Sequence, residues 1–301
     1  MNAADSIFVF NIAKLAVRSI LSAASLHPKP GLTTPLDNDA LDGTDFQRLL
    51  DGAMGLLPCF VNCASLGHET ESMKPEEVMS LLRSVGQRGE HDALQATHGG
   101  LAMRGRIFLL GLLCASAARL SAQKRNLTPM ALALTASSFV RGIAERDLWN
   151  IEENTEDGAR TDGEQAYILY GMEGCRGEAE HGFQLTLSAA VQLLNLAGTH
   201  GHLPMRERAI HVLLSVIAEN TDTSIARRGG IDSLFQVQEA AKNAISAGGM
   251  LTPRGREALS AMDIDFRRRG VSPRGSCAIL SAAMFVISLG ELRMTRSEPE
   301  E

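Results

Sequence analysis

Aromatic side chains are scarce in this sequence. Its 301 residues include one Trp, two Tyr and ten Phe, which together make up 4% of the chain. Proteins that bind nucleic acids usually combine a basic surface with aromatic side chains that stack on the bases. Because the formal net charge is −6, we expect no nucleic acid partner. Ala and Leu outnumber Val and Ile in most apolar stretches, which favours helices over strands.

Cysteine is also sparse. The five cysteines include no Cys-x-x-Cys spacing, and only Cys59 and Cys63 lie close together. This pattern excludes a disulfide framework and a zinc motif, so we expect a cytoplasmic protein in a reducing compartment. The apolar N-terminus predicts an amphipathic helix rather than a signal peptide, and the charge-free run 275–290 is shorter than a bilayer span. We therefore expect no membrane partner.

Apolar residues recur at the spacing of an α-helix, and no stretch shows a clean apolar/polar alternation typical of a strand. The positions i, i+3, i+4 and i+7 are apolar at Val78, Leu81, Leu82 and Val85, and again at Ile210, Leu213, Leu214 and Ile217. Capping threonines precede Pro129 and Pro253. The sequence predicts an all-α protein with a single domain over residues 1–301. The expected helices lie near 6–26, 44–66, 75–88, 105–121, 128–146, 183–197, 205–219, 231–247, 252–269 and 275–292.

Five connections between these helices combine glycine or proline with charged residues. They lie at 27–31, 97–106, 174–182, 222–230 and 267–276. Glycine lets backbone amides approach a ligand, helix N-termini offer unpaired N–H groups, and arginine binds phosphate oxygens in a bidentate way. Together these features predict a pocket for a discrete polyphosphate ligand. The alternative is that cations such as Arg267, Arg268 and Arg269 only stabilise the end of a helix.

The segment 176–180 holds two acids beside an arginine. If it is extended, Arg176, Glu178 and Glu180 lie on one side, where the carboxylates could hold Mg²⁺ or act as a base beside a cationic transition state. The alternative is that both acids stabilise the first turn of a helix. Lys29, between two prolines, is either aimed at a phosphate or is an exposed turn lysine.

These loops resemble the triphosphoribosyl-dephospho-CoA synthase family, and the resemblance covers nearly the whole chain. The segments that carry it are Pro28-Lys29-Pro30-Gly31-Leu32, Gly174-Cys175-Arg176-Gly177-Glu178-Ala179-Glu180, Asp222-Thr223, Arg228-Gly229-Gly230 and Ser272-Pro273. The resemblance implies an all-α enzyme that joins ATP to 3′-dephospho-CoA and releases adenine. In that reaction the 2′-hydroxyl of dephospho-CoA attacks C1 of the ATP ribose, and the product is the prosthetic-group precursor for the acyl carrier protein of citrate lyase or malonate decarboxylase.

The resemblance also implies roles for individual residues, with Mg²⁺ expected to accompany ATP. Catalytic roles fall on Glu178, Glu180 and Asp222, phosphate binding on Lys29, Arg104, Arg176, Arg228, Ser272 and Arg274, and metal binding on Glu178, Glu180 and Asp39. Two other hypotheses stay open: a non-catalytic nucleotide-binding paralogue that acts as an accessory or regulatory protein, and a related transferase with a different nucleotide substrate. A homodimer is also compatible with the sequence.

Several positions differ from the motifs of that family. Its Asn-Thr-His-Lys-Gly corresponds here to Leu101-Ala102-Met103-Arg104-Gly105, and its Ser-Pro-Gly-Gly-Ser-Ala-Asp to Ser272-Pro273-Arg274-Gly275-Ser276-Cys277-Ala278. An arginine therefore takes the place of a glycine, and an alanine takes the place of an aspartate that could serve as a metal ligand or base.

Overall fold

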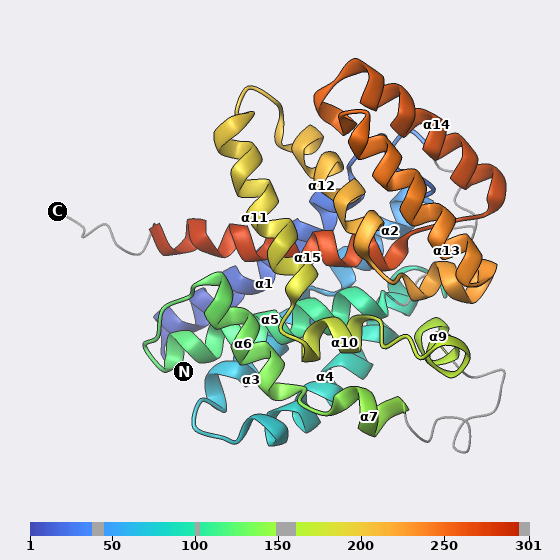
Figure 1. Ribbon diagram of the computed structural model, residues 1–301. Coiled ribbons are helices and arrows are strands. Elements are labelled where there is room, and N and C mark those ends of the chain that lie inside the picture. The colour runs from blue at the N-terminus through green and yellow to red at the C-terminus, as the bar shows by residue number, and fades with distance from the viewer. Residues whose placement is uncertain (38–44, 100–102, 149–160, 295–301) are drawn as a thin grey trace.

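The computed structural model describes residues 1–37, 45–99, 103–148 and 161–294, and this part of the chain contains helices and no strand (Figure 1). The predicted all-α fold is confirmed. The helices are α1 (Ala3–Ala24), α2 (Phe46–Gly55), α3 (Leu57–Glu69), α4 (Pro75–Ala96), α5 (Arg104–Ala122), α6 (Pro129–Phe139), α7 (Ile143–Leu148), α9 (Asp162–Tyr170), α10 (Cys175–Glu180), α11 (Gln184–Thr199), α12 (Met205–Glu219), α13 (Thr223–Ser246), the 3₁₀ turn η2 (Gly249–Leu251), α14 (Pro253–Arg269) and α15 (Arg274–Met294).

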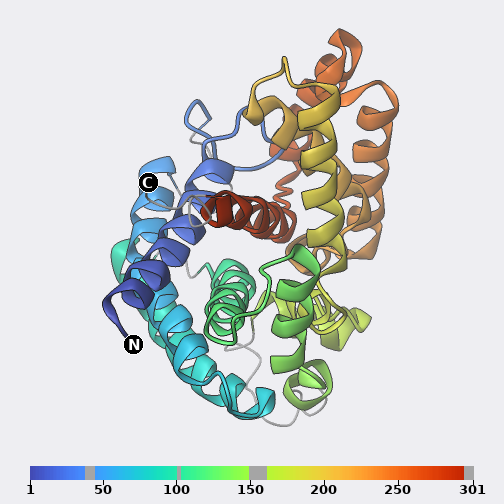
Figure 2. The ribbon, with the colours of Figure 1, turned by 90° about the vertical axis from the view of Figure 1, so that its left-hand side faces the viewer.

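Two helices, α5 and α15, form the centre of the molecule. α5 is buried on all sides, as expected for a helix that has no polar face. It crosses α3 so closely that a Cβ on Gly67 would lie 2.0 Å from the carbonyl oxygen of Ala115. Figure 2 shows α15 between the N-terminal helices on one side and helices α11 to α14 on the other. The two central helices thus bring both halves of the chain together.

Three helical stretches are long and apolar enough to cross a membrane by length and composition alone. They are α1, α2 with α3, and α5. In this structure α5 is mostly buried inside the protein, and α1 packs against α3, α5 and α15. Their apolar surface therefore contributes to the core.

The predicted helices differ from the observed ones mainly at breaks. The helix expected over 44–66 is two helices that meet at Leu56, because Pro58 starts a new first turn. The helix expected over 128–146 ends at Phe139, and α7 begins only after Gly142, whose φ is +70°. Glycine also interrupts α13, at Gly230 with φ +75° and ψ 176°, so the helix expected over 231–247 corresponds to the part of α13 after this break.

Candidate active site

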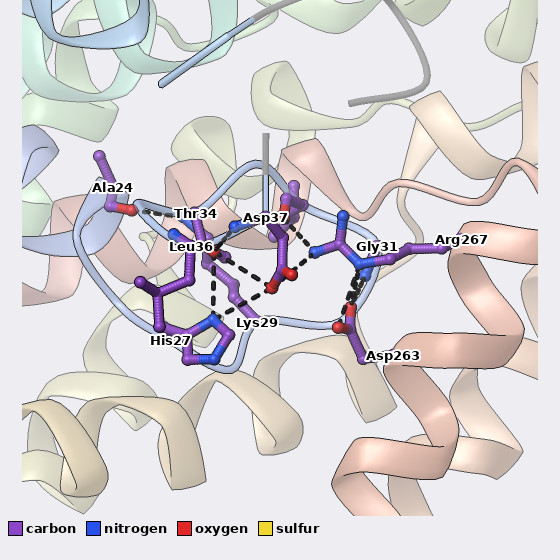
Figure 3. Close-up of polar contacts among 10 residues, drawn as sticks. Ala24, His27, Lys29, Gly31, Thr34, Leu36, Asp37, Asp263 and Arg267 are labelled. Carbon is purple, nitrogen blue, oxygen red and sulfur yellow. Dashed lines mark hydrogen bonds and ion pairs between the residues drawn. The ribbon is translucent and has the colours of Figure 1, made fainter. Parts of the chain in front are cut away.

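The loop after α1 buries Lys29, which is only 1% exposed. Its Nζ donates hydrogen bonds to the carbonyl oxygens of Ala23 at 3.0 Å and Ala24 at 2.9 Å. These are among the last carbonyls of α1, which lack partners within the helix. The expectation of an exposed turn lysine is therefore wrong. Lys29 binds carbonyl groups at the C-terminal end of α1 and is buried in the protein (Figure 3).

The environment of Lys29 lowers its pKa from 10.5 to about 8. Burial is the main cause, because it penalises the charged amine. Cys277 raises the pKa, whereas the positive charges of Arg106 and Arg267 lower it further. Arg106 and Arg267, from distant parts of the sequence, thus lie within electrostatic reach of Lys29.

Arg267 and Asp263, both in α14, hold the loop that contains Lys29. The Nε of Arg267 donates to both carboxylate oxygens of Asp263 at 3.1 Å, and Asp263 Oδ1 also accepts a hydrogen bond from Gly31 N at 2.8 Å. On the other side of the guanidinium, Asp37 lies 3.6 Å from Nη2 and 3.1 Å from His27 Nδ1 (Figure 3). The guanidinium of Arg267 is therefore neutralised by two carboxylates and stabilises the loop.

The segment 176–180 is helical, so the extended conformation considered as one possibility is not formed. Its two acids bind the starts of two different helices. Glu178 accepts hydrogen bonds from Thr186 N at 2.8 Å and Leu185 N at 3.3 Å, in the first turn of α11. Glu180 accepts from Ala144 N at 3.0 Å and from Gly142 N, where α7 begins. The predicted pair of carboxylates on one side is therefore not formed, and the alternative of helix-stabilising acids describes them better.

Arg176 joins three short helices. Its Nε lies 3.5 Å from Asp147 Oδ2 in α7, and its Nη2 lies 3.7 Å from Glu164 Oε1 in α9. Asp147 in addition binds Arg83 of α4 through both of its oxygens. Arg176 therefore has two carboxylate neighbours and contributes to the packing of α7, α9 and α10.

Asp222 is a buried carboxylate, 2% exposed, that caps two helices at once. At the start of α13 it accepts hydrogen bonds from the Ser224 amide at 3.1 Å and hydroxyl at 2.5 Å. At the start of α15 it accepts from the Ser276 amide at 2.8 Å and hydroxyl at 3.0 Å. A Cβ on Gly275 would lie 2.9 Å from Asp222 Oδ1, so glycine is required for this close approach. All of these partners of Asp222 are neutral groups.

Glycines show that four helix starts meet at one place. A Cβ on Gly105, in the first turn of α5, would lie 3.2 Å from Cys175 Sγ and 3.6 Å from the Ala278 side chain. A Cβ on Gly174, just before α10, would lie 3.0 Å from the Thr223 side chain. With the contact between Gly275 and Asp222, these distances link the first turns of α5, α10, α13 and α15. We call this place the helix-start junction.

The pKa of the half-buried Cys175 thiol is raised, and the causes of this rise identify the charged groups at the helix-start junction. Desolvation is the largest cause of its rise to about 12, followed by the negative charges of Asp222 and Glu178. Arg176 and Arg106 act in the opposite direction. The predicted site residues Asp222, Glu178 and Arg176 thus lie around one thiol.

The other predicted phosphate-binding residues lie near the helix-start junction or at the surface. Ser272 precedes α15, and its carbonyl accepts a hydrogen bond from the Ser224 hydroxyl at 3.1 Å. Arg274, in the first turn of α15, donates to Asp162 of α9 at 3.4 Å. Arg228 is exposed on α13.

Two predicted residues remain. Arg104 is about half exposed and forms an ion pair with Glu90 of α4, so its guanidinium is engaged at the surface end of α5. Asp39, a predicted metal ligand, lies outside the described residues. Within the described ranges, no group of three or more His, Cys, Asp or Glu side chains could hold a metal ion.

Sequence reasoning missed several residues of this region. α9 was not predicted, although Thr161 and Glu164 form a capping box whose spacing is visible in the sequence. Asp162 of that helix pairs with both Arg274 and Arg227. Arg106 lies in the predicted connection 97–106, but its burial carried no local signal, because Cys277 and Lys29 come from segments far away in the chain.

An all-α fold whose helix starts meet around a buried carboxylate, with lysine and arginine side chains nearby, defines a protein suited to bind a phosphorylated ligand. The ATP:dephospho-CoA triphosphoribosyl transferase family model matches residues 10–297, and the chain belongs to this family. It is therefore an enzyme of the transferase class, which joins the triphosphoribosyl group of ATP to dephospho-CoA.

Individual relatives agree with this assignment. The chain is 33% identical over 283 residues to a Citrobacter koseri protein described as a 2-(5''-triphosphoribosyl)-3'-dephosphocoenzyme-A synthase, covering 93% of this chain and 91% of the relative. It is 30% identical over 275 residues to the synthase of that name from Escherichia fergusonii, covering 91% and 89%. A crystal structure from Archaeoglobus fulgidus, described as a triphosphoribosyl-dephospho-CoA synthase, has a TM-score of 0.51 at 14% identity and covers 79% of this chain and 97% of that one. At this identity the likeness to the crystal structure concerns the fold alone.

Proposed function

We propose that the transfer of the triphosphoribosyl group takes place at the helix-start junction and that Asp222 is the carboxylate that serves it. The observation that carries this proposal is the environment of Asp222, which is 2% exposed and hydrogen-bonded to the neutral groups of Ser224 and Ser276. No cation is among these partners, so the carboxylate keeps its negative charge available to its surroundings. In a buried site such a charge acts strongly on a nearby cation.

The reaction needs a group that stabilises positive charge on a ribose. The 2′-hydroxyl oxygen of dephospho-CoA forms a bond to C1 of the ATP ribose, and the bond from C1 to the adenine nitrogen breaks. The electron pair of that bond leaves with adenine, which takes up a proton at this nitrogen, and the hydroxyl gives up its proton, so the number of protons is unchanged. The ribose resembles an oxocarbenium ion in the transition state, as in glycoside chemistry. Asp222 lowers the energy of that state electrostatically, without having to move.

The triphosphate keeps its bonds throughout this reaction and needs only to be held. The starts of α13 and α15 carry the partial positive charge of the helix dipoles, and Arg228 and Arg274 lie on these two helices. Helix starts and guanidinium groups favour anions. We therefore propose that the triphosphate lies across the starts of α13 and α15.

The carboxylates predicted to bind Mg²⁺ do not form a metal site in the described chain. Glu178 and Glu180 accept hydrogen bonds from amides of different helices. Mg²⁺ often binds through substrate phosphates and water, with one or two carboxylates. We propose that Mg²⁺, where it takes part, enters with ATP, and no step is assigned to a resident ion.

The reaction is tested by incubating the purified protein with ATP and 3′-dephospho-CoA. We expect free adenine by chromatography and a dephospho-CoA derivative heavier by one triphosphoribosyl group in the mass spectrum. Asp222→Asn should lower kcat by about 10²- to 10³-fold. The matched control is Asp232→Asn, an exposed acid of the same helix. A wild-type protein that is folded but yields neither product would refute the proposed function, and an unchanged kcat in Asp222→Asn would refute the role of Asp222.

The destination of the product is a further part of the proposal. We propose that the product is made in the cytoplasm as the prosthetic-group precursor of the acyl carrier protein of citrate lyase or malonate decarboxylase. The test is to express this chain in a strain that lacks its own synthase and to measure each of the two enzymes. Recovery of one activity identifies the carrier protein, and recovery of neither contradicts this assignment.

A further inference from the structure

Arg106 is a buried cation whose hydrogen-bonding capacity is only partly used. It lies in the first turn of α5 and is 8% exposed. Its Nη2 donates to the sulfur of Cys277 at 3.4 Å, a weak acceptor. Its buried Nε has no hydrogen-bond partner in the part of the chain that the structure describes. A buried guanidinium is normally paired, so this group is arranged for a partner that comes from outside the described chain.

Lys29 adds a second buried cation to the same region. Its amine lies within electrostatic reach of both Arg106 and Cys277, and its two hydrogen bonds go to neutral carbonyl groups. Arg267, the third cation nearby, is neutralised by Asp263 and Asp37. In the described chain, Lys29 and Arg106 therefore have no carboxylate among their hydrogen-bond partners.

Backbone groups add charge of the same sign. Arg106 and Cys277 lie in the first turns of α5 and α15, where the helix dipoles place partial positive charge. Beside them, Ala278 packs near Gly105, at the position where the resembled motif has an aspartate. The negative side chain that could bind a divalent cation is thus absent at a place where a guanidinium is present.

We propose that Arg106 and Lys29 form a built-in polyphosphate-binding site, in which fixed cations supply the positive charge that a protein-bound Mg²⁺ would otherwise supply. On binding, the guanidinium exchanges its weak bond to Cys277 for bonds to phosphate oxygens. The choice of ligand rests on the proposed function, in which the polyphosphate belongs to ATP or dephospho-CoA. The site itself predicts that the protein binds polyphosphate without a divalent metal.

The direct test is calorimetric titration with inorganic tripolyphosphate in the presence of a chelator. We expect the wild-type protein to bind, and Arg106→Met to bind at least about tenfold more weakly, because one charged hydrogen bond is worth about that much. Arg254→Met, which removes an exposed guanidinium from α14, is the matched control and should bind as the wild type does. Unchanged binding by Arg106→Met, or wild-type binding only when Mg²⁺ is present, would overturn the proposal.

A second measurement separates binding from folding. Removing an unpaired buried charge should leave the melting temperature of the ligand-free Arg106→Met protein equal to or above that of the wild type. The rise in melting temperature on adding tripolyphosphate should be lost in this variant only. If Arg106→Met does not fold, Arg106→Lys decides the question, because it keeps the charge but loses the Nε donor; several-fold weaker binding supports the proposal and equal binding overturns it.

Competition distinguishes the source of the phosphates and separates this inference from the proposed function. Displacement of tripolyphosphate by ATP alone assigns the site to the triphosphate, and displacement by dephospho-CoA alone assigns it to the diphosphate of that substrate. Displacement by neither overturns the site as a substrate site. If the protein binds tripolyphosphate through Arg106 but releases no adenine, this inference stands and the proposed function fails. If adenine release is unaffected in Arg106→Met, this inference fails and the proposed function stands.

Discussion

At the scale of the residue, Lys29 shows how burial changes the properties of a charged group. Its pKa in the folded protein is about 8, below the value of 10.5 for a free lysine. Between these two pH values the unfolded chain binds more protons than the folded one, so this lysine makes the free energy of unfolding rise with pH from about 8 to about 10.5. The full effect is about 3 kcal/mol.

Replacing Lys29 by Met should remove this contribution. We expect the difference in unfolding free energy, wild type minus Lys29→Met, to increase as the pH rises from 7 to 10, measured by denaturant titration. Groups such as Cys175, which titrate in both proteins, cancel in that difference. The control is Lys242→Met at an exposed position of α13. Parallel stability curves for the wild type and Lys29→Met would contradict the assigned pKa.

Gly275 offers a second prediction at this scale. A Cβ at this position would lie 2.9 Å from Asp222 Oδ1, and the buried carboxylate is held by hydrogen bonds that resist its displacement. We expect Gly275→Ala to lower the unfolding free energy by about 1–3 kcal/mol and to slow adenine release.

The same helix provides the control for Gly275. Gly290 also lies in α15, and a Cβ there meets no described atom within 4 Å. Gly290→Ala should raise the unfolding free energy by up to about 1 kcal/mol, because alanine favours the helix. If calorimetry gave the same change in unfolding free energy for Gly275→Ala and Gly290→Ala, the contact between Gly275 and Asp222 would not be tight.

At the scale of the element, some acidic side chains accept hydrogen bonds from the first-turn amides of a neighbouring helix rather than of their own helix. α11 begins after Phe183, which provides no side-chain cap, and Glu178 supplies the missing acceptor from α10. We expect Glu178→Gln to lower the unfolding free energy by about 1 kcal/mol and to speed hydrogen exchange of the first-turn amides of α11. Glu239→Gln, at an exposed position of α13, is the control. Exchange that is unchanged in α11 would mean that this contact contributes little.

The interiors of the helices could be predicted from the apolar periodicity of the sequence. Helix ends could be predicted only where a capping residue such as threonine marks them. The apolar stripes at 78–85 and 210–217 lie in α4 and α12, and Thr128 and Thr252 cap α6 and α14 as predicted. The breaks at Leu56 and Gly142 were missed because apolar periodicity continues across them. α10 was missed because a helix of six residues shows too little periodicity to detect.

The site could be predicted only in part, for a related reason. Glycine-rich loops marked the segments that meet at the helix-start junction, and Asp222 and Ser272 lie in two of these segments. The contacts of Glu178 with α11 and of Lys29 with α1 could not be derived, because they depend on how the chain turns between helices. Arg106 stands next to a glycine in the sequence, but its burial results from α15, which comes much later in the chain.

At the scale of the whole molecule, the central position of α5 predicts where the fold is most stable. Its residues are buried on all sides, and it packs against α1, α3, α6 and α15. Its amides should exchange hydrogen among the slowest in the protein, at the rate of global unfolding, whereas the shorter and more exposed α9 should exchange faster. Hydrogen exchange with mass spectrometry measures both. Comparable rates in the two helices would contradict a core organised around α5.

The contact between Arg106 and Cys277 joins residues 171 positions apart in the sequence. During synthesis on the ribosome, the helix-start junction therefore cannot be assembled around the first turn of α5 until α15 has been translated. A truncated chain that lacks α15 can retain helices but cannot bring these groups together. Enzyme activity in a translation reaction should accordingly appear only after α15 has left the ribosome, which makes turnover a sensitive measure of how far synthesis has proceeded.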